Sequence, residues 1–157
     1  MIRISRMTDY GIALMTRIVQ DPGAESFSSR DLADKLSLPQ PTVSKLLKTL
    51  TRGDLLVSQR GVNGGYELAL PAEEITLTRL IDVLEGPIAM TVCSTDDAEN
   101  SCDLETHCML SGHWKWINRK IMQALAGVTL ADIAGSRGVE IGAAKRTGEG
   151  QPLGEST

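Results

Sequence analysis

Aromatic residues are scarce in this 157-residue chain, at 3%. No apolar run approaches the roughly 18 residues that a transmembrane helix needs. Asp9 and Arg17 interrupt the N-terminal stretch, so it lacks the apolar core of a signal peptide. We therefore expect a soluble, cytoplasmic protein that does not bind membranes. Thiols stay reduced in that compartment, which argues against a structural disulfide.

Catalytic signatures are also missing from the sequence. No C-x-x-C motif lies beside a βαβ pattern, and no other group of residues resembles a catalytic constellation. We expect that the protein is not an enzyme. The alternative, from a functional class other than DNA-binding regulators, is a thiol oxidoreductase or a carrier of iron–sulfur clusters.

The three cysteines of the chain lie close together. They are Cys93, Cys102 and Cys108, spaced C-x8-C-x5-C in a polar stretch. An odd number of thiols cannot all pair within one chain, and a polar loop is a poor place for cysteines that only pack. Thiolates gathered on one loop suit a soft metal or an iron–sulfur cluster. A structural zinc site, which usually contains a tighter cysteine pair, and a metal-free thiol redox switch remain alternatives.

Charge is uneven along the chain, whose net charge is −4. Residues 1–70 carry nine Lys/Arg against seven Asp/Glu, or +2, and residues 71–157 carry seven against thirteen, or −6. A mildly basic half beside an acidic half is compatible with nucleic-acid binding by the first half alone.

The first half has the order of elements of a winged helix-turn-helix. A helix is expected over residues 8–20, capped near Thr8 or Asp9, and a second helix opens at the capping sequence 28–31. A third helix begins around Pro41, with an apolar stripe of Val43, Leu46, Leu47 and Leu50. Two short strands, 55–59 and 66–70, flank a glycine-rich turn. We therefore predict a mainly α fold with a small β-hairpin.

This order places several polar residues where DNA contacts occur. The outer face of the third helix is small, hydroxylated and basic, and the hairpin has an arginine at its tip. Such a helix enters the major groove, while the wing reaches phosphates or the minor groove. The candidate contacts are Ser28, Ser29, Arg30, Thr42, Ser44, Lys45, Lys48, Arg60, Gly64 and Gly65.

The second half contains helices of a different kind. A linking helix is expected over residues 75–84 and a long helix over 111–126, followed by a short helix over 129–134. The long helix carries a near-heptad stripe, which predicts dimerisation through Trp114, Ile117, Ile121 and Leu125. The resulting domains are 1–71 (winged helix-turn-helix), 72–90 (linking helix and turn), 91–110 (cysteine loop) and 111–134 (dimerisation and terminal helices). Residues 135–157 are glycine-rich and are predicted to be a disordered tail.

Two stretches carry a resemblance to a known family. The wing sequence VSQRGVNGGY (57–66), and the three-cysteine loop followed by a Trp-bearing helix, resemble the IscR/NsrR-type iron–sulfur winged-helix regulators of bacteria. The resemblance covers residues 1–134. Within the family, the sequences at 102–105, 114–119 and 127–133 look most like the regulators of SUF-type iron–sulfur cluster assembly.

The resemblance implies a homodimeric regulator that binds a double-stranded DNA operator. It would be a repressor of iron–sulfur cluster assembly genes, and its 4Fe-4S or 2Fe-2S cluster would sense iron or cluster status, oxygen or nitric oxide. Cys93, Cys102 and Cys108 would hold the cluster, although the first gap is eight residues where the cluster-assembly regulators have five.

The fourth ligand differs among members of the family. Some use a histidine three residues after the last cysteine, where this chain has Ser111. Nitric-oxide-sensing relatives use an acidic residue early in the first helix, supplied by the partner subunit, and Asp9 matches that position. The alternative role for Asp9 is that of a carboxylate placed against the dipole of its own helix.

Overall fold

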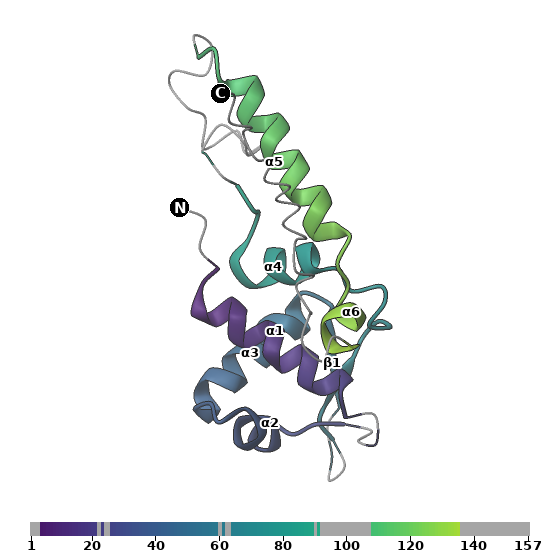
Figure 1. Cartoon of the computed structure of the whole chain (residues 1–157). Coiled ribbons are helices and arrows are strands. Elements are labelled where there is room, and N and C mark those ends of the chain that lie inside the picture. Colours follow the sequence, from purple (N-terminus) through teal and green to yellow (C-terminus); the bar gives the residue numbers. More distant parts are fainter. Residues whose placement is uncertain are drawn as a thin grey trace, which may run out of the picture.

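Six helices and one two-stranded antiparallel sheet form the described part of the chain (Figure 1). The computed structural model describes residues 4–21, 23, 26–59, 61, 64–89, 91 and 108–135. The elements are α1 (Arg6–Val19), α2 (Ser29–Leu36), α3 (Gln40–Arg52), β1 (Leu56–Ser58), β2 (Tyr66–Leu68), α4 (Leu77–Glu85), α5 (Ser111–Ala126) and α6 (Leu130–Gly135). The predicted class, mainly α with a small hairpin, is confirmed. The tail was predicted over 135–157; Gly135 is the last residue of α6, and residues 136–157 lie outside the described residues.

The core forms where α1, α2 and α3 pack together. The predicted stripe of α3 is buried, with Val43, Leu47 and Leu50 fully inaccessible to solvent. The other helices add Leu14 and Met15 from α1, Leu32 and Ala33 from α2, Leu80 from α4 and Leu130 from α6. The core therefore includes α6, although the sequence had grouped that helix with the dimerisation segment.

The helix starts follow local capping chemistry. Ser28 accepts a hydrogen bond from the Asp31 amide at 3.1 Å, which confirms the predicted cap of α2. Helix α1 begins earlier than predicted, because Ser5 is its cap and accepts from the Thr8 amide at 3.2 Å. Thr8 instead lies inside the helix and is fully buried.

The wing consists of β1, β2 and one further stretch of chain. Leu56 pairs with Leu68, and Ser58 pairs with Tyr66. Phe27 bridges to Tyr66 through two backbone hydrogen bonds of 3.0 and 2.9 Å, a contact that the sequence did not predict. A Cβ atom on Gly65 would lie 2.8 Å from the Phe27 carbonyl oxygen, so this position needs glycine.

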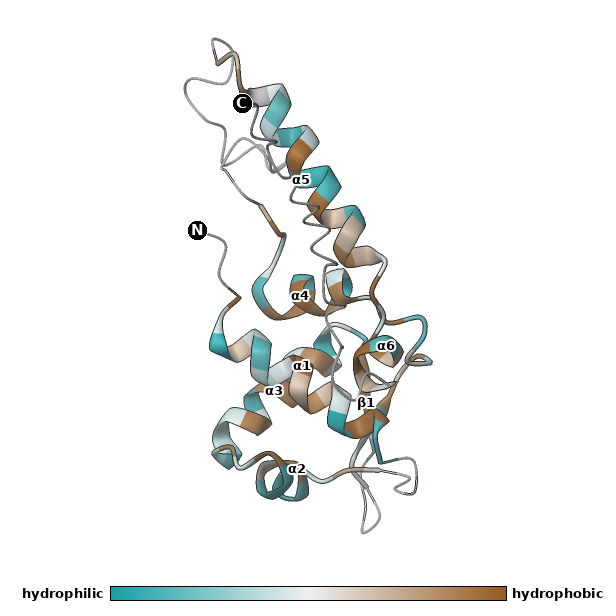
Figure 2. Ribbon diagram, in the orientation of Figure 1, coloured by the Kyte–Doolittle hydropathy of each residue, from teal (hydrophilic) through white to brown (hydrophobic). Residues whose placement is uncertain are grey.

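Helix α4 connects this body to α5. It packs on α1, where Gly11 meets Leu84, and on α3, where Gly53 meets Val83. Figure 1 shows α5 projecting from the body beyond its contact with α4. Figure 2 shows apolar segments recurring along α5 between hydrophilic ones. None of the helices within the described ranges is both long enough and apolar enough to cross a membrane.

The tight contact of Gly53 with α4 yields a stability prediction. A Cβ atom on Gly53 would lie 2.4 Å from Cγ1 of Val83, whose branched side chain is stiff. We expect Gly53→Ala to lower the free energy of unfolding, measured with urea, by about 1–3 kcal/mol.

Two further variants test the cause. In a Val83→Ala background the cost of Gly53→Ala should largely disappear, because the obstructing methyl groups are gone. Gly112→Ala is the control, since none of the described residues has an atom within 4 Å of the added Cβ atom. It should leave stability unchanged or raise it by up to about 1 kcal/mol. An equal cost of Gly53→Ala in both backgrounds would show that Val83 is not the cause.

Candidate nucleic-acid interface

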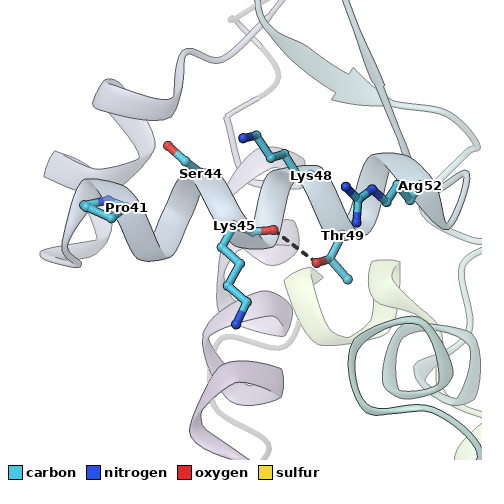
Figure 3. Close-up of a pocket in the computed structure, with 6 residues that line it drawn as sticks. All are labelled: Pro41, Ser44, Lys45, Lys48, Thr49 and Arg52. Carbon is cyan, nitrogen blue, oxygen red and sulfur yellow. Dashed lines mark hydrogen bonds between the residues drawn. The ribbon is translucent and has the colours of Figure 1, made fainter.

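The outward face of α3 forms a shallow surface hollow of about 460 Å³. Burial of the apolar stripe turns the intervening positions toward solvent, and Figure 3 shows the residues that line the hollow. In that view Ser44 and Lys48 project from one edge of the helix, and Lys45 projects from the other. The full set is Pro41, Ser44, Lys45, Lys48, Thr49 and Arg52.

This face is positively charged. Lys45, Lys48 and Arg52 are exposed, and α3 contains no acidic residue. Among the described residues, none of the three cations forms an ion pair. A set of unneutralised cations on one helix face attracts phosphate groups.

Three of the six residues that line the hollow, Ser44, Lys45 and Lys48, are among the predicted DNA contacts. Thr42 does not line the hollow and so lies at its margin, while Thr49 lines it and was not predicted. The Thr49 hydroxyl donates to the Lys45 carbonyl at 3.1 Å, so it is engaged within the helix (Figure 3). The spacing of 45, 49 and 52 was the signal that would have found it.

The start of α2 holds the next predicted contacts. The Ser28 hydroxyl is engaged by Asp31, donating to its carboxylate at 2.6 Å. Arg30 is exposed, and Ser29 and Arg30 occupy the first turn, where a helix leaves N–H groups without intrahelical partners. The backbone and Arg30 are therefore better placed to meet a phosphate than the Ser28 side chain.

The wing is described only in part. Arg60, the predicted contact at its tip, lies outside the described residues. The Gly64 amide donates to the Gly61 carbonyl at 3.0 Å, and Gly65 is buried against Phe27. Internal packing therefore already explains a glycine at 65.

The predicted cluster ligands are only partly described. Cys93 and Cys102 lie outside the described ranges, whereas Cys108 is half-buried just before α5. Asp9 is exposed in the first turn of α1, and no other described side chain hydrogen-bonds its carboxylate. Figure 1 shows the start of α5 at the far end of the projecting helix, away from the body that contains α1. Among the described residues, no three His, Cys, Asp or Glu side chains are grouped as a metal site would require.

The sequence did not predict a role for Glu85, whose carboxylate lies at the start of α1. Glu85, the last residue of α4, accepts a hydrogen bond from the backbone N–H of Ser5. Hydrogen bonds from the Ser5 and Thr8 side chains, together with that amide, hold the pKa of Glu85 below its ordinary value. The contact fastens the start of α1 to the end of α4.

Known proteins are similar to this chain in sequence and in fold. The profile of the Rrf2 family, whose members are described as iron-dependent transcriptional regulators, matches residues 4–136. CymR of Bacillus subtilis is 28% identical over 133 residues, covering 85% of this chain and 90% of CymR. NsrR of Oceanobacillus iheyensis is 29% identical over 109 residues, covering 69% of this chain and 74% of NsrR.

Solved structures give the same result. The chain resembles the structure of CymR, the global cysteine regulator of B. subtilis, with a TM-score of 0.66 and 27% identity, covering 86% of this chain and 98% of that one. It resembles IscR of T. potens with a TM-score of 0.63 and 26% identity, covering 84% and 85%. The proteins that this chain resembles are regulators, which confirms the expectation that it is not an enzyme.

The charged face of α3 yields a prediction about salt dependence. If Lys48 contacts a phosphate, Lys48→Ala removes one counterion-releasing contact. We expect the slope of log affinity against log salt, measured on a fixed duplex, to become shallower by about one unit. Lys120→Ala, an exposed lysine on α5, is the control and should keep the slope of the unaltered chain. An unchanged slope in Lys48→Ala would place DNA elsewhere.

Proposed function

Because the chain belongs to the Rrf2 family of transcriptional regulators, we propose that it is a homodimeric DNA-binding repressor that senses its signal through an iron–sulfur cluster. Its targets would be genes of iron–sulfur cluster assembly. The observation that carries this proposal is the unneutralised cationic face of α3, which is presented beside a wing. The family's description as iron-dependent, and the likeness to IscR and NsrR, support the cluster.

DNA reading divides among three surfaces. Helix α3 enters the major groove with Ser44, Lys45 and Lys48, while Thr42 lies at the margin of the contact. The start of α2 holds a phosphate through the backbone N–H groups of its first turn, at Ser29 and Arg30, and through the Arg30 side chain, with Ser28 capping the helix. The wing, with Arg60 at its tip, reaches phosphates or the minor groove. In a dimer the two α3 helices then read half-sites about one helical turn apart, roughly 34–36 Å.

The exposed state of α5 supports a dimer. The near-heptad side chains Trp114, Ile117, Ile121 and Leu125 are large and apolar, yet each is only half-buried in a single chain. Leu110 and Trp116 remain 56% and 58% exposed. A second α5 would cover the stripe in the manner of a coiled coil, which removes apolar surface from water.

The set of donor atoms fits an iron–sulfur cluster in which one iron is bound more weakly than the others. The three thiolates of Cys93, Cys102 and Cys108 are the ligands such clusters prefer, and the Asp9 carboxylate is the oxygen donor. Asp9 is exposed in a single chain, as a ligand supplied to the partner subunit must be. When bound, the cluster supplies a centre that reacts with oxygen or nitric oxide or loses iron.

The position of Asp9 connects this site to DNA reading. Asp9 lies one turn from Ser5, which Glu85 fastens to α4. Release of the Asp9 carboxylate would leave the start of α1 held by the Glu85 contact alone, and α3 packs on this helix. A small shift of α1 would then change the spacing of the two α3 helices and weaken operator binding.

The metal content tests the cofactor. Protein purified without oxygen should contain iron and acid-labile sulfide in similar amounts and absorb visible light. Cys108→Ser should lose both, while Ser101→Ala, a change of similar size in the same loop, should keep them. Zinc without iron would overturn the cluster and support a structural zinc site. Metal-free protein with a reversible disulfide would support a thiol switch.

The fourth ligand is tested separately. Asp9→Ala should retain iron through the cysteines, but its affinity for an operator selected from random duplexes should fall by at least about tenfold, as expected when half-site spacing is lost. Asp82→Ala, an exposed aspartate on α4, is the control. Unchanged operator affinity in Asp9→Ala with the cluster intact would remove Asp9 from the mechanism.

A further inference from the structure

Gln40 is the first residue of α3, and its side chain is exposed to solvent. It lies four residues before Ser44 and eight before Lys48, so these three side chains follow one row along the helix. Among the described residues, none hydrogen-bonds its amide group. The carbonyl oxygen and the NH2 group of this side chain are therefore both available to a molecule that approaches α3 from outside.

The start of α3 is built differently from other helix starts of the same body. Helices α1, α2 and α4 each begin at a serine or threonine whose side chain accepts a hydrogen bond from the first turn, whereas α3 begins at Pro39, which forms none. Pro41 has no N–H group, and the amides of Thr42 and Val43 both donate to the Pro39 carbonyl, at 2.9 and 3.2 Å. The backbone here offers a phosphate one N–H group, that of Gln40. The main polar group of this helix start is thus the Gln40 side chain.

Charge is unevenly placed along the outward face of α3. The first five residues of the helix carry no charge, whereas Lys45, Lys48 and Arg52 follow them. Figure 3 shows Pro41 at one end of the helix and Arg52 toward the other. In a helix-turn-helix the N-terminal residues of the recognition helix contact base edges, while cations contact phosphates. The uncharged start is therefore the part of α3 that is suited to base edges.

A primary amide matches one base of the major groove better than the others. Adenine presents the N7 acceptor beside the N6 amino donor, and a glutamine side chain bonds both at once. Guanine presents two acceptors, so the carbonyl oxygen of a glutamine would face an acceptor. Cytosine offers a donor alone and thymine an acceptor with a methyl group, so each would use one half of the amide.

We propose that Gln40 is a specificity-determining residue that reads an adenine in each operator half-site. Its NH2 group donates to N7 of the adenine, and its carbonyl oxygen accepts from the N6 amino group. The proposal rests on the proposed function only in requiring that α3 enter the major groove. It does not depend on a cluster or on the cysteines.

Selection and a base analogue test this contact together. Duplexes are selected from a random pool with the full chain purified without oxygen, and the bound duplexes are sequenced. Each adenine of the selected half-site is then replaced in turn by 7-deazaadenine, which has a C–H group in place of N7 and keeps Watson–Crick pairing. At one position this replacement should lower the affinity of the unaltered protein by about fivefold or more, as the loss of one hydrogen bond predicts.

Two variants identify the protein side of the contact. Gln40→Ala should lower the affinity for the selected duplex by a similar factor or more, and it should no longer respond to 7-deazaadenine at that position, because the group that bonded N7 is gone. A new selection with Gln40→Glu should lose the adenine there and favour cytosine, whose amino group a carboxylate accepts. Gln123→Ala, which removes an exposed amide from α5, is the matched control and should keep both the affinity and the response. Circular dichroism should show the same helix content in all variants.

The outcomes separate this proposal from the wider function. If the chain selects an operator but Gln40→Ala responds to 7-deazaadenine as the unaltered protein does, Gln40 does not read adenine, while operator binding stands. If Gln40→Ala weakens the selected and unrelated duplexes alike, Gln40 contacts the backbone of DNA and the proposal is overturned in the same way. If no duplex is enriched over the random pool, operator binding itself fails, and the adenine contact fails with it.

Discussion

Burial of the apolar side of α3 is the constraint on which the rest of the structure depends. Val43, Leu46, Leu47 and Leu50 are removed from water, and each such side chain contributes roughly 1.5–3 kcal/mol. Because side chains project in every direction around a helix, burying one side also decides which side chains point outward. The cationic hollow thus follows directly from the packing of the core. Any change that rotated α3 about its axis would damage the core and the surface together.

Helix α4 is the element through which the parts of the molecule meet. It contacts α3 at Gly53, where Arg79 also donates to the Gly53 carbonyl at 3.0 Å. It contacts α1 at Gly11 and again through the carboxylate of Glu85. Both glycines allow approaches that a larger residue would obstruct. The segment that follows α4 leads to the cysteines. Movement of that segment would therefore pull on α4, which contacts both α1 and the end of α3.

The sequence predicted features that depend on neighbouring residues. The apolar stripe of α3, the Ser28 cap and the bounds of α5 were found because periodicity and capping are local signals. It did not predict the Phe27 bridge, the Glu85 contact or the hydrogen bond from Asn118 to the Ile88 carbonyl. Each of these joins residues thirty or more positions apart, and no local pattern marks the partner. Gly65 was predicted as a DNA contact because it lies in the wing. The structure gives another reason for a glycine there, which is its close packing against the Phe27 backbone.

The return of α6 to the core has a consequence for how the chain matures during synthesis. Leu130 is fully buried in the same core as Leu14 and Met15, and Gln20 donates to the Ala134 carbonyl at 3.0 Å. A nascent chain that has emerged only as far as its wing therefore lacks one wall of its core. The DNA-reading body is completed after the cysteine region has left the ribosome. A chain whose DNA-reading body is complete therefore already contains its three cysteines. A prematurely terminated chain would expose apolar surface that quality-control proteases recognise.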